Sequence, residues 1–288
     1  MTPADIGLSV AVQLLWGFGF VAAKPAVAHF PPLMLMGMMY VVTCLCFAPR
    51  LRRIRTPLPS LLLISTFVAT VQGALIFNAL AALPASISIL LLQTQVPFSV
   101  FFAWLLSRER PSPARLLGIL MAFAGVAIVA GAPTGTASFW PAVMMTAGSA
   151  SWSFGQAAAR RFARDDGMTL TTGIAAMAIP QVAIVSALTE HGQLAALTSA
   201  SLYIWTIFAF FSLGGFVLAY AIWYGLLRRY RVDQVTPFAL LMPIIGVVGS
   251  YLFLGEPVSV SELAGGVIIL AGVAVVVWAK EPARLRAG

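Results

Sequence analysis

The sequence predicts an all-α integral membrane protein whose ten transmembrane helices form two inverted five-helix repeats. Three observations predict this fold. First, 60% of the 288 residues are hydrophobic and only 9% are charged, whereas a soluble domain carries about 25% charged residues. Second, ten long apolar runs divide the chain so that sixteen of its seventeen lysine and arginine residues fall on one face. Third, the second half of the chain repeats the first.

The ten apolar runs account for nearly the whole chain. A spanning helix needs about 20 mostly apolar residues, so no separate soluble domain fits beside ten of them. We expect helices because a lone helix satisfies its own backbone polar groups in lipid, whereas an open strand does not. The expected spans are residues 5–23, 32–49, 59–80, 85–106, 114–131, 138–159, 168–188, 201–226, 233–254 and 262–279.

The cationic connections predict the orientation in the membrane. An excess of arginine and lysine in short loops marks the cytoplasmic face, which places both termini in the cytoplasm. Lys24 is the one cation on the other face, where it ends its helix. The net charge of +8 does not indicate nucleic acid, because the cations lie in short loops beside apolar runs. Orientation and anionic lipid headgroups explain them better.

The internal repeat divides the chain into residues 1–136 and 137–288. Residues 14–24 (LLWGFGFVAAK) match residues 150–160 (ASWSFGQAAAR), with Trp16 opposite Trp152. At a second offset, Gly118 and Gly125 match Gly265 and Gly272, and Glu109 matches Glu256. Five spans per repeat is an odd number, so the second half enters the bilayer from the opposite face. Inverted repeats are typical of secondary transporters. Chance similarity between apolar segments is the alternative.

Longer motifs in both halves resemble a known family. The first half opens with WGFGFVAAK (residues 16–24) and continues with QVPFSVFFAWLLSRERPSPARLLGILMAFAGVAIVAG (residues 95–131). The second half carries LMPIIGVVGSYLFLGEPVSVSELAGGVIILAGVAVVV (residues 241–277). The chain resembles the drug/metabolite transporter superfamily with two tandem EamA-type domains, and the bacterial YddG-type amino-acid exporters are the nearest analogy. The resemblance implies an exporter of amino acids or similar small organic metabolites in a bacterial inner membrane, working by alternating access around a central cavity. We expect a monomer or a homodimer.

Polar and aromatic side chains within the spans are the candidate substrate contacts. Polar groups inside a bilayer are costly unless they face protein or water. In the first span such residues recur at i, i+3, i+4, i+7 and i+11, which places them on one helical face, and the sixth span repeats the pattern from Ser149 to Arg160. The alternative is helix packing by small and polar residues. The substrate-binding candidates are Gln13, Trp16, Phe20, Asn78, Gln93, Trp152, Gln156, Tyr220 and Tyr224.

Glycine and proline positions mark candidate hinges. Proline removes a backbone donor and leaves a carbonyl without its helical partner, so Pro97, Pro237 and Pro243 predict interrupted fourth and ninth spans. Gly17 is a fourth candidate hinge. A static kink is the alternative for each proline. The recurring glycines of the fifth and tenth spans predict close helix packing, within one subunit or between two.

The ionisable residues constrain the transport chemistry. All nine acids fall at span ends or in loops, so we expect facilitated or weakly coupled transport, since proton relays in membranes use embedded carboxylates. Glu109 and Glu256 are expected to fix the turn into the next helix. Lys24 either binds a substrate carboxylate at the external mouth or extends to the headgroups.

Other functions are less well supported by the sequence. Organic cations would favour a buried acid, and nucleotide sugars would need cations deep in the membrane; neither pattern occurs in the chain. The HExxH, GxSxG and P-loop motifs do not occur either, so we expect a protein that is not an enzyme. Cys44 and Cys46 lack metal-site spacing, and no metal or cofactor is expected. A non-transporting membrane protein is the remaining alternative.

Overall fold

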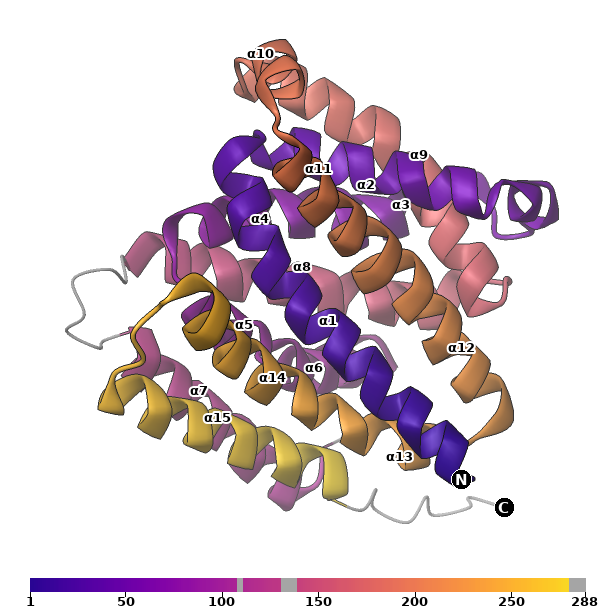
Figure 1. Cartoon of the computed structure of the whole chain (residues 1–288). Coiled ribbons are helices and arrows are strands. Elements are labelled where there is room, and N and C mark those ends of the chain that lie inside the picture. The colour runs from indigo at the N-terminus through magenta and orange to yellow at the C-terminus, as the bar shows by residue number, and fades with distance from the viewer. Residues whose placement is uncertain (108–110, 131–138, 280–288) are drawn as a thin grey trace.

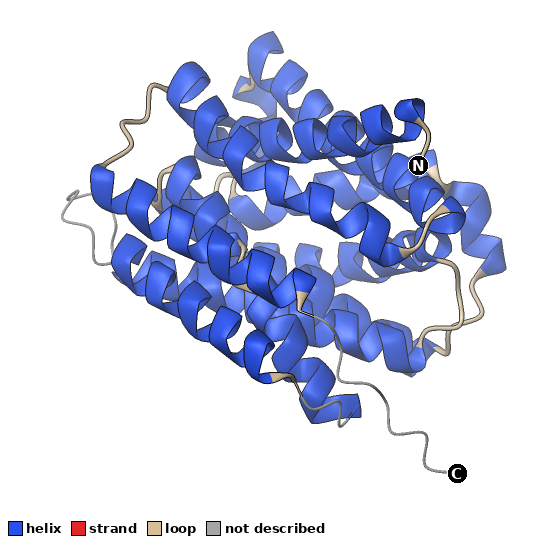
Figure 2. Ribbon diagram, turned by 90° about the horizontal axis from the view of Figure 1, so that it is seen from below, coloured by secondary structure: helices blue, strands red, loops and turns tan. Residues whose placement is uncertain are grey.

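The chain folds into a bundle of long helices (Figures 1 and 2). The structure is a computed structural model that describes residues 1–107, 111–130 and 139–279, and within these ranges it contains helices and connections but no strand. Up to residue 130 the elements are α1 (Pro3–His29), α2 (Pro32–Cys46), η1 (Ala48–Arg53), α3 (Leu58–Ser65), η2 (Thr66–Val71), α4 (Gln72–Ala82), α5 (Ala85–Leu92), α6 (Gln95–Ser107) and α7 (Pro113–Ala130). From residue 139 they are α8 (Phe139–Phe162), α9 (Gly167–Thr189), α10 (Gln193–Ser199), α11 (Leu202–Ala209), η3 (Phe210–Leu218), α12 (Ala219–Arg229), α13 (Val232–Val235), η4 (Thr236–Leu240), α14 (Leu241–Gly249), η5 (Ser250–Leu254) and α15 (Val260–Trp278).

Local sequence signals fix where several of these helices begin. Thr2 accepts a hydrogen bond from the backbone N–H of Asp5 at the start of α1. Asp166 does the same for the first turn of α9. Ser259 and Glu262 form a reciprocal capping box at the start of α15. Such caps satisfy backbone donors that have no partner inside the helix.

Each expected span coincides with a helical segment. Eight segments of the described chain are long and apolar enough to cross a membrane. The helix α2 is apolar but has only 15 residues, and α8 has 24 residues with a less apolar sequence. The expected end of the first span at residue 23 is wrong, because α1 continues through Pro25 to His29. A proline is tolerated in a membrane helix where neighbouring groups satisfy the carbonyl that it leaves without a partner.

Two pairs of segments depart from regular α-helix at corresponding places. In the expected third span, η2 is a π-helical segment between α3 and α4, and in the eighth span η3 is a longer one between α11 and α12. In the fourth span α5 ends at Leu92 and α6 begins at Gln95, and in the ninth the 3₁₀ segment η4 precedes α14. Short π-helical segments within α-helices occur often at functional sites.

The helices α7 and α15 lie side by side at one end of the bundle (Figure 1). A Cβ atom built on Gly118 would lie 2.6 Å from the carbonyl oxygen of Gly272, and one on Gly125 would lie 2.6 Å from that of Gly265. The two helices therefore run antiparallel and touch through backbone atoms, as close packing at small residues requires. The glycine contacts expected from the sequence form within one subunit.

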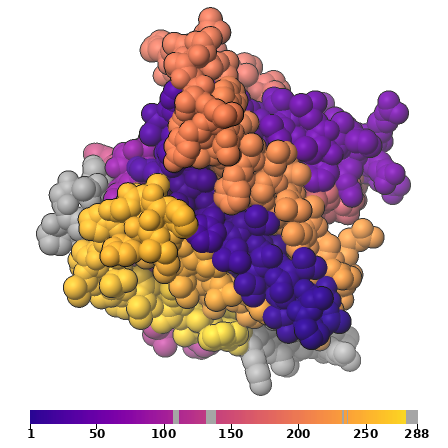
Figure 3. Space-filling view, in the orientation of Figure 1, coloured from indigo at the N-terminus to yellow at the C-terminus, as the bar shows by residue number. Residues whose placement is uncertain are grey.

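The first helix of each half packs against the other half of the chain. The helix α1 packs against α11, η3, α12 and α14, while α8 packs against α3, η2, α4 and α6. Figure 3 shows α1 crossing the front of the molecule between residues 202–229 and the C-terminal helices. Gly19 of α1 lies against Gly215 of η3, and Gly155 of α8 lies against Val68 of η2. These contacts correspond to one another under the offsets of the sequence repeat.

The outer surface of the bundle is apolar. Leu120 is 68% exposed, Leu188 77% and Phe253 70%. Trp140, Tyr203 and Trp278 are also largely exposed near helix ends, where amphipathic aromatic rings meet the membrane surface. A large exposed apolar surface of this kind fits contact with lipid rather than water.

Candidate functional site

An aromatic cluster joins α1 to α12. The ring of Trp16 lies 5.5 Å from that of Tyr220 and 5.2 Å from that of Trp223, between centroids. Tyr224 continues the cluster at 5.8 Å from Tyr220, and its hydroxyl accepts a hydrogen bond of 3.3 Å from Thr171 of α9. The structure thus brings three predicted contact residues together and adds Trp223 to them. Edge-on and offset aromatic pairs of this kind contribute about 0.5–1.5 kcal/mol each beyond burial.

The other predicted contact residues have different surroundings. Trp152 and Gln156 are half-buried on α8, and Gln93 is buried at the end of α5, where its amide donates only to Ile89 of the same helix at 3.4 Å. Asn78 is exposed on α4 and donates to the Ala74 carbonyl one turn earlier. Phe20 is half-buried and packs against the main apolar core.

The serines of the α8 stripe hold helices together. Ser153 donates to the Gln95 carbonyl at 2.8 Å, and Ser149 approaches the Leu92 carbonyl at 3.4 Å. Both carbonyls flank the break between α5 and α6. Their role in cavity lining was one of two interpretations of the stripe, and the hydrogen bonds favour the other, helix packing. Trp152 and Gln156 make no such bonds and stay candidates.

Gln13 has the most unusual environment of the predicted residues. Its side chain is 0% exposed, and within the structure neither its amide nitrogen nor its amide oxygen has a hydrogen-bond partner. One turn later, Gly17 packs so closely on α14 that an added Cβ would lie 2.7 Å from Ile245 and 3.1 Å from the Met242 carbonyl oxygen. A buried amide without partners costs about 1–3 kcal/mol for each polar group left unsatisfied.

The predicted hinges fall at helix beginnings or contacts. Pro97 lies in the first turn of α6, Pro243 in the first turn of α14 and Pro237 at the start of η4. Proline is favourable in a first turn, where its missing N–H is not needed. These prolines therefore follow interruptions in the spans. Gly17 lies inside the unbroken α1, where the absence of a side chain permits close packing.

Lys24 has a different role from both alternatives considered for it. Its ammonium group donates to the carbonyl oxygens of Leu80 at 2.7 Å, Ala81 at 3.2 Å and Leu83 at 2.6 Å. These carbonyls belong to the C-terminal end of α4, which lacks helical donors and attracts cations. Lys24 therefore caps α4 from α1.

Two glutamates support helix ends from a distance in the chain. Glu256 accepts hydrogen bonds from the N–H groups of Ala85 and Ser86 at the start of α5, at 2.9 and 3.1 Å. The expectation that Glu256 fixes the turn into its own next helix is therefore corrected, because it stabilises a helix of the other half. Its expected counterpart Glu109 lies outside the described residues. Glu190 caps α2 in the same way, through Leu33 and Met34.

Sequence reasoning missed a polar network between η2 and α9. The Gln181 amide oxygen accepts from Thr70 at 2.7 Å and Thr66 at 3.2 Å, and its nitrogen donates to Ser65 at 2.9 Å. The signal was present, because Gln181 follows Pro180 in the middle of an apolar run. The network joins the first half of the chain to the second at a π-helical segment.

Apolar helices with polar and aromatic side chains packed between the halves define a multi-pass membrane protein. The model of the EamA-like transporter family matches residues 5–131 and 139–278. The chain is 29% identical to a "Probable amino-acid metabolite efflux pump" of Salmonella typhimurium over 94% of each chain. It is 24% identical to the "Uncharacterized inner membrane transporter YedA" of Escherichia coli K12, over 93% of this chain and 89% of that one.

The fold agrees with these similarities. A solved crystal structure with 21% sequence identity superposes with a TM-score of 0.66 and covers 96% of both chains. The chain belongs to the EamA-like transporter family. It is therefore a multi-pass inner-membrane transporter and not an enzyme.

Proposed function

We propose that this transporter exports amino acids or similar small organic metabolites by alternating access. In this proposal ten helices cross the membrane as two inverted repeats, residues 1–136 and 137–288, with both termini in the cytoplasm. The observation that carries the proposal is the reciprocal packing of α1 and α8, each against the other half of the chain. Two similar units that exchange contacts in this way can rock around a site between them.

The side-chain hydrogen bonds from α8 to the fourth span differ from those of α1 to the ninth span. We infer that the ninth span moves more than the fourth. Ser149 and Ser153 hold the broken fourth span against α8. The repeat places Gln13 and Gly17 at the equivalent positions of α1. Gly17 has no side chain, and the Gln13 amide has no hydrogen-bond partner among the described residues. These two positions of α1 therefore provide no side-chain hydrogen bond to the described part of the segment from η4 to α14.

The side chains favour neutral or zwitterionic cargo. The candidate contacts are aromatic rings around Trp16 and the neutral amides of Gln13, Gln93 and Gln156, which can both donate and accept hydrogen bonds. The ammonium group of Lys24 is used by the α4 carbonyls, which weighs against a phosphate-bearing nucleotide sugar. The name of the Salmonella typhimurium relative, an amino-acid metabolite efflux pump, supports amino-acid export.

Uptake into liposomes containing the purified protein tests the cargo and the site. Amino acids, nucleosides and organic cations would be offered to the parent protein, to Trp16→Ala and Gln156→Ala, and to Trp140→Ala as a control. We expect amino acids to be moved, and both site variants to lose at least about tenfold in rate while the control does not. Transport of organic cations alone would contradict the cargo, and unchanged rates in both site variants would contradict the site.

The energy source and the topology have separate tests. A strong stimulation of transport by a pH gradient would contradict facilitated transport. For the topology, single cysteines would replace Arg53, Arg229 and Thr134 in a chain without its native cysteines. In intact cells we expect an external maleimide to label position 134 but neither of the other two. Labelling at positions 53 and 229 with none at 134 would overturn the orientation and the span count.

A further inference from the structure

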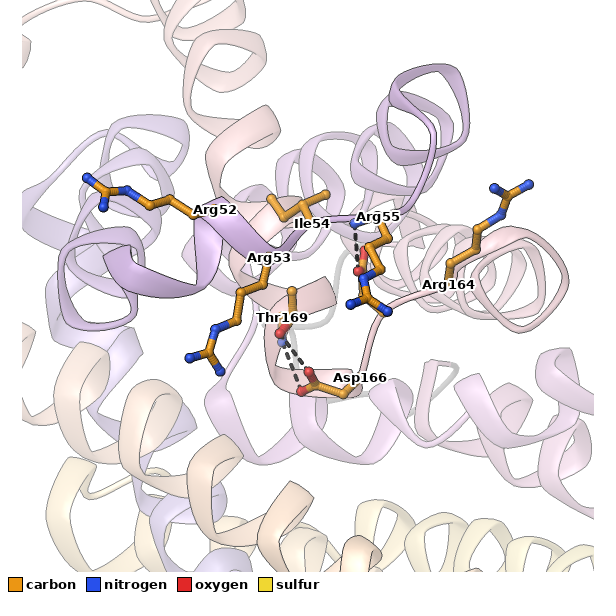
Figure 4. Close-up of a pocket in the computed structure, with 8 residues that line it drawn as sticks. Arg52, Arg53, Ile54, Arg55, Arg164, Asp166 and Thr169 are labelled. Atoms are coloured by element: carbon orange, nitrogen blue, oxygen red, sulfur yellow. Dashed lines mark hydrogen bonds between the residues drawn. The ribbon is translucent and has the colours of Figure 1, made fainter.

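A pocket of about 570 Å³ lies between two connections of the bundle. One connection, residues 47–57, joins α2 to α3, and the other, residues 163–166, joins α8 to α9. The pocket is lined by Arg52, Arg53, Ile54, Arg55, Arg164, Asp165, Asp166 and Thr169 (Figure 4). Since both connections leave apolar helices, the pocket lies at a membrane surface whichever face this is.

The two aspartates of the pocket form hydrogen bonds with neighbouring protein groups. Asp165 accepts hydrogen bonds from the N–H groups of Arg55 at 2.8 Å and Thr56 at 3.0 Å, and from the Thr56 hydroxyl at 2.6 Å. Asp166 caps α9 and accepts from Thr169 at 2.7 Å. Burial by itself would raise the pKa of both carboxyl groups, but these hydrogen bonds outweigh it and lower the pKa. Both groups are therefore anionic at neutral pH.

The four arginines of the pocket present exposed guanidinium groups. Arg52, Arg53, Arg55 and Arg164 are exposed, and in the part of the chain that the structure describes no carboxylate pairs with their guanidinium groups. Asp166 pairs instead with Arg50, at 3.4 Å, and Arg50 does not line the pocket. Four arginines against two aspartates leave the lining with a net charge of +2.

The arrangement of the side chains separates the arginines into two sets. In Figure 4 the side chains of Arg53 and Arg55 extend downward from their connection on either side of Thr169, while Arg52 and Arg164 extend outward in different directions. The first pair therefore offers guanidinium groups to an anion in the pocket. The second pair lies where it adds to the attraction of the surrounding surface.

We propose that this pocket binds the phosphate of an anionic phospholipid headgroup. A guanidinium group presents several N–H donors in a planar fork that matches phosphate oxygens. Leu51 and Leu58 are exposed beside the arginines at 37% and 58%, so the same connection offers apolar contact for acyl chains. Basic pockets between spanning helices at a membrane surface suit anionic headgroups in this way.

The occupied pocket would reinforce a contact between the two halves of the chain. The Asp165 carboxylate already binds residues 55 and 56 of the first half, and the Arg164 N–H donates to the Thr56 hydroxyl at 3.0 Å. An anion beside Arg55 offsets the repulsion among the arginines gathered there. The lipid therefore stabilises the arrangement in which these connections are joined.

Lipid binding to the purified full-length protein in detergent tests the proposal. Native mass spectrometry would compare phosphatidylglycerol with phosphatidylcholine for the parent protein and for the double variant Arg53→Gln, Arg55→Gln. The matched control is Arg160→Gln, Arg228→Gln, which removes the same charge from exposed arginines outside the pocket. Size-exclusion profiles and melting temperatures would confirm that all three proteins are folded.

We expect the parent and the control to prefer phosphatidylglycerol, and the pocket variant to lose about thirtyfold of that preference. This corresponds to about 1 kcal/mol for each arginine. The absence of a preference in the parent, or an equal loss in the control, would overturn a specific pocket. Added inorganic phosphate or glycerol 3-phosphate should not displace the lipid at equal concentration. Displacement by either would show a site for a free phosphate compound and overturn the lipid assignment.

Discussion

Replacing Gln13 with leucine should make the protein more stable. The Gln13 amide is fully buried in α1, and its nitrogen and oxygen make no hydrogen bond within the structure. Leucine has a similar size and no polar group to satisfy. The substitution therefore removes a polar group that has no hydrogen-bond partner among the described residues.

The size of the effect follows from the two unsatisfied atoms. A buried donor or acceptor without a partner costs about 1–3 kcal/mol, and local relaxation recovers part of this cost. We expect a gain of about 2 kcal/mol, and for a chain of this length about 2–4 °C in melting temperature for each kcal/mol. The expected increase is therefore about 4–8 °C.

Gln181→Leu is the matched control, because it deletes the same amide where every polar atom is bonded. Its oxygen accepts from Thr70 and Thr66, and its nitrogen donates to Ser65. Thr70 is 8% exposed and would be left without this partner. We expect this variant to lose about 1–3 kcal/mol of unfolding free energy. The same change from glutamine to leucine should therefore raise stability at position 13 and lower it at position 181.

Thermal unfolding followed by tryptophan fluorescence in one detergent measures both variants. Transport by Gln13→Leu should fall despite its higher stability, because we assign the amide to the substrate path and functional groups often reduce stability. A lower melting temperature for Gln13→Leu, or equal shifts for both variants, would refute the reasoning. A stabilised variant with parental transport would remove Gln13 from the path.

Three further predictions concern contacts between the halves. Gly272→Ala should lower the melting temperature, because its Cβ would lie 2.6 Å from backbone atoms of α7 and overpacking costs about 1–3 kcal/mol. The control Gly225→Ala has open space around it and should leave the melting temperature unchanged. Equal shifts in the two variants would contradict the contact. Glu256→Gln should destabilise the protein by about 1 kcal/mol, because the charge at the α5 N-terminus is lost, and unchanged thermal stability would argue against this cap. The pKa of Asp165 is lowered by its hydrogen bonds against the effect of burial, so its contribution is present at neutral pH and is lost as the pH falls below about 4. Asp165→Asn should therefore be less stable than the parent protein at pH 7, by a difference that narrows steadily as the pH falls from about 5 toward about 2. A difference that stays constant over this range would contradict an ionic origin.

Helix positions were predictable because their causes are local. Apolar runs of membrane length fold as helices, since no other element satisfies its own backbone in lipid. Each expected span coincides with a helical segment, and eight of the segments in the described chain are long and apolar enough to cross a membrane. The first span was expected to end at residue 23, whereas α1 continues past Pro25 to His29.

The candidate site was predictable only in part. The stripe on the first span predicts that Trp16 shares a face with other polar and aromatic residues. The identity of its ring partners depends on α12, about two hundred residues away in the chain. Ser149 and Ser153 share the spacing of Trp152 and Gln156, yet they bond to the broken fourth span. Spacing along one helix gives a face and does not say what covers it.

The sequence by itself determined the class of protein and the helical segments, because hydropathy and charge are properties of the chain. Only the tertiary structure decided what each polar group bonds. Lys24 caps the end of α4, Glu256 caps the start of α5, and the Gln13 amide has no partner among the residues that the structure describes. Hydrogen bonds form between groups brought together by packing, and in this molecule those groups lie in different helices and often in different halves.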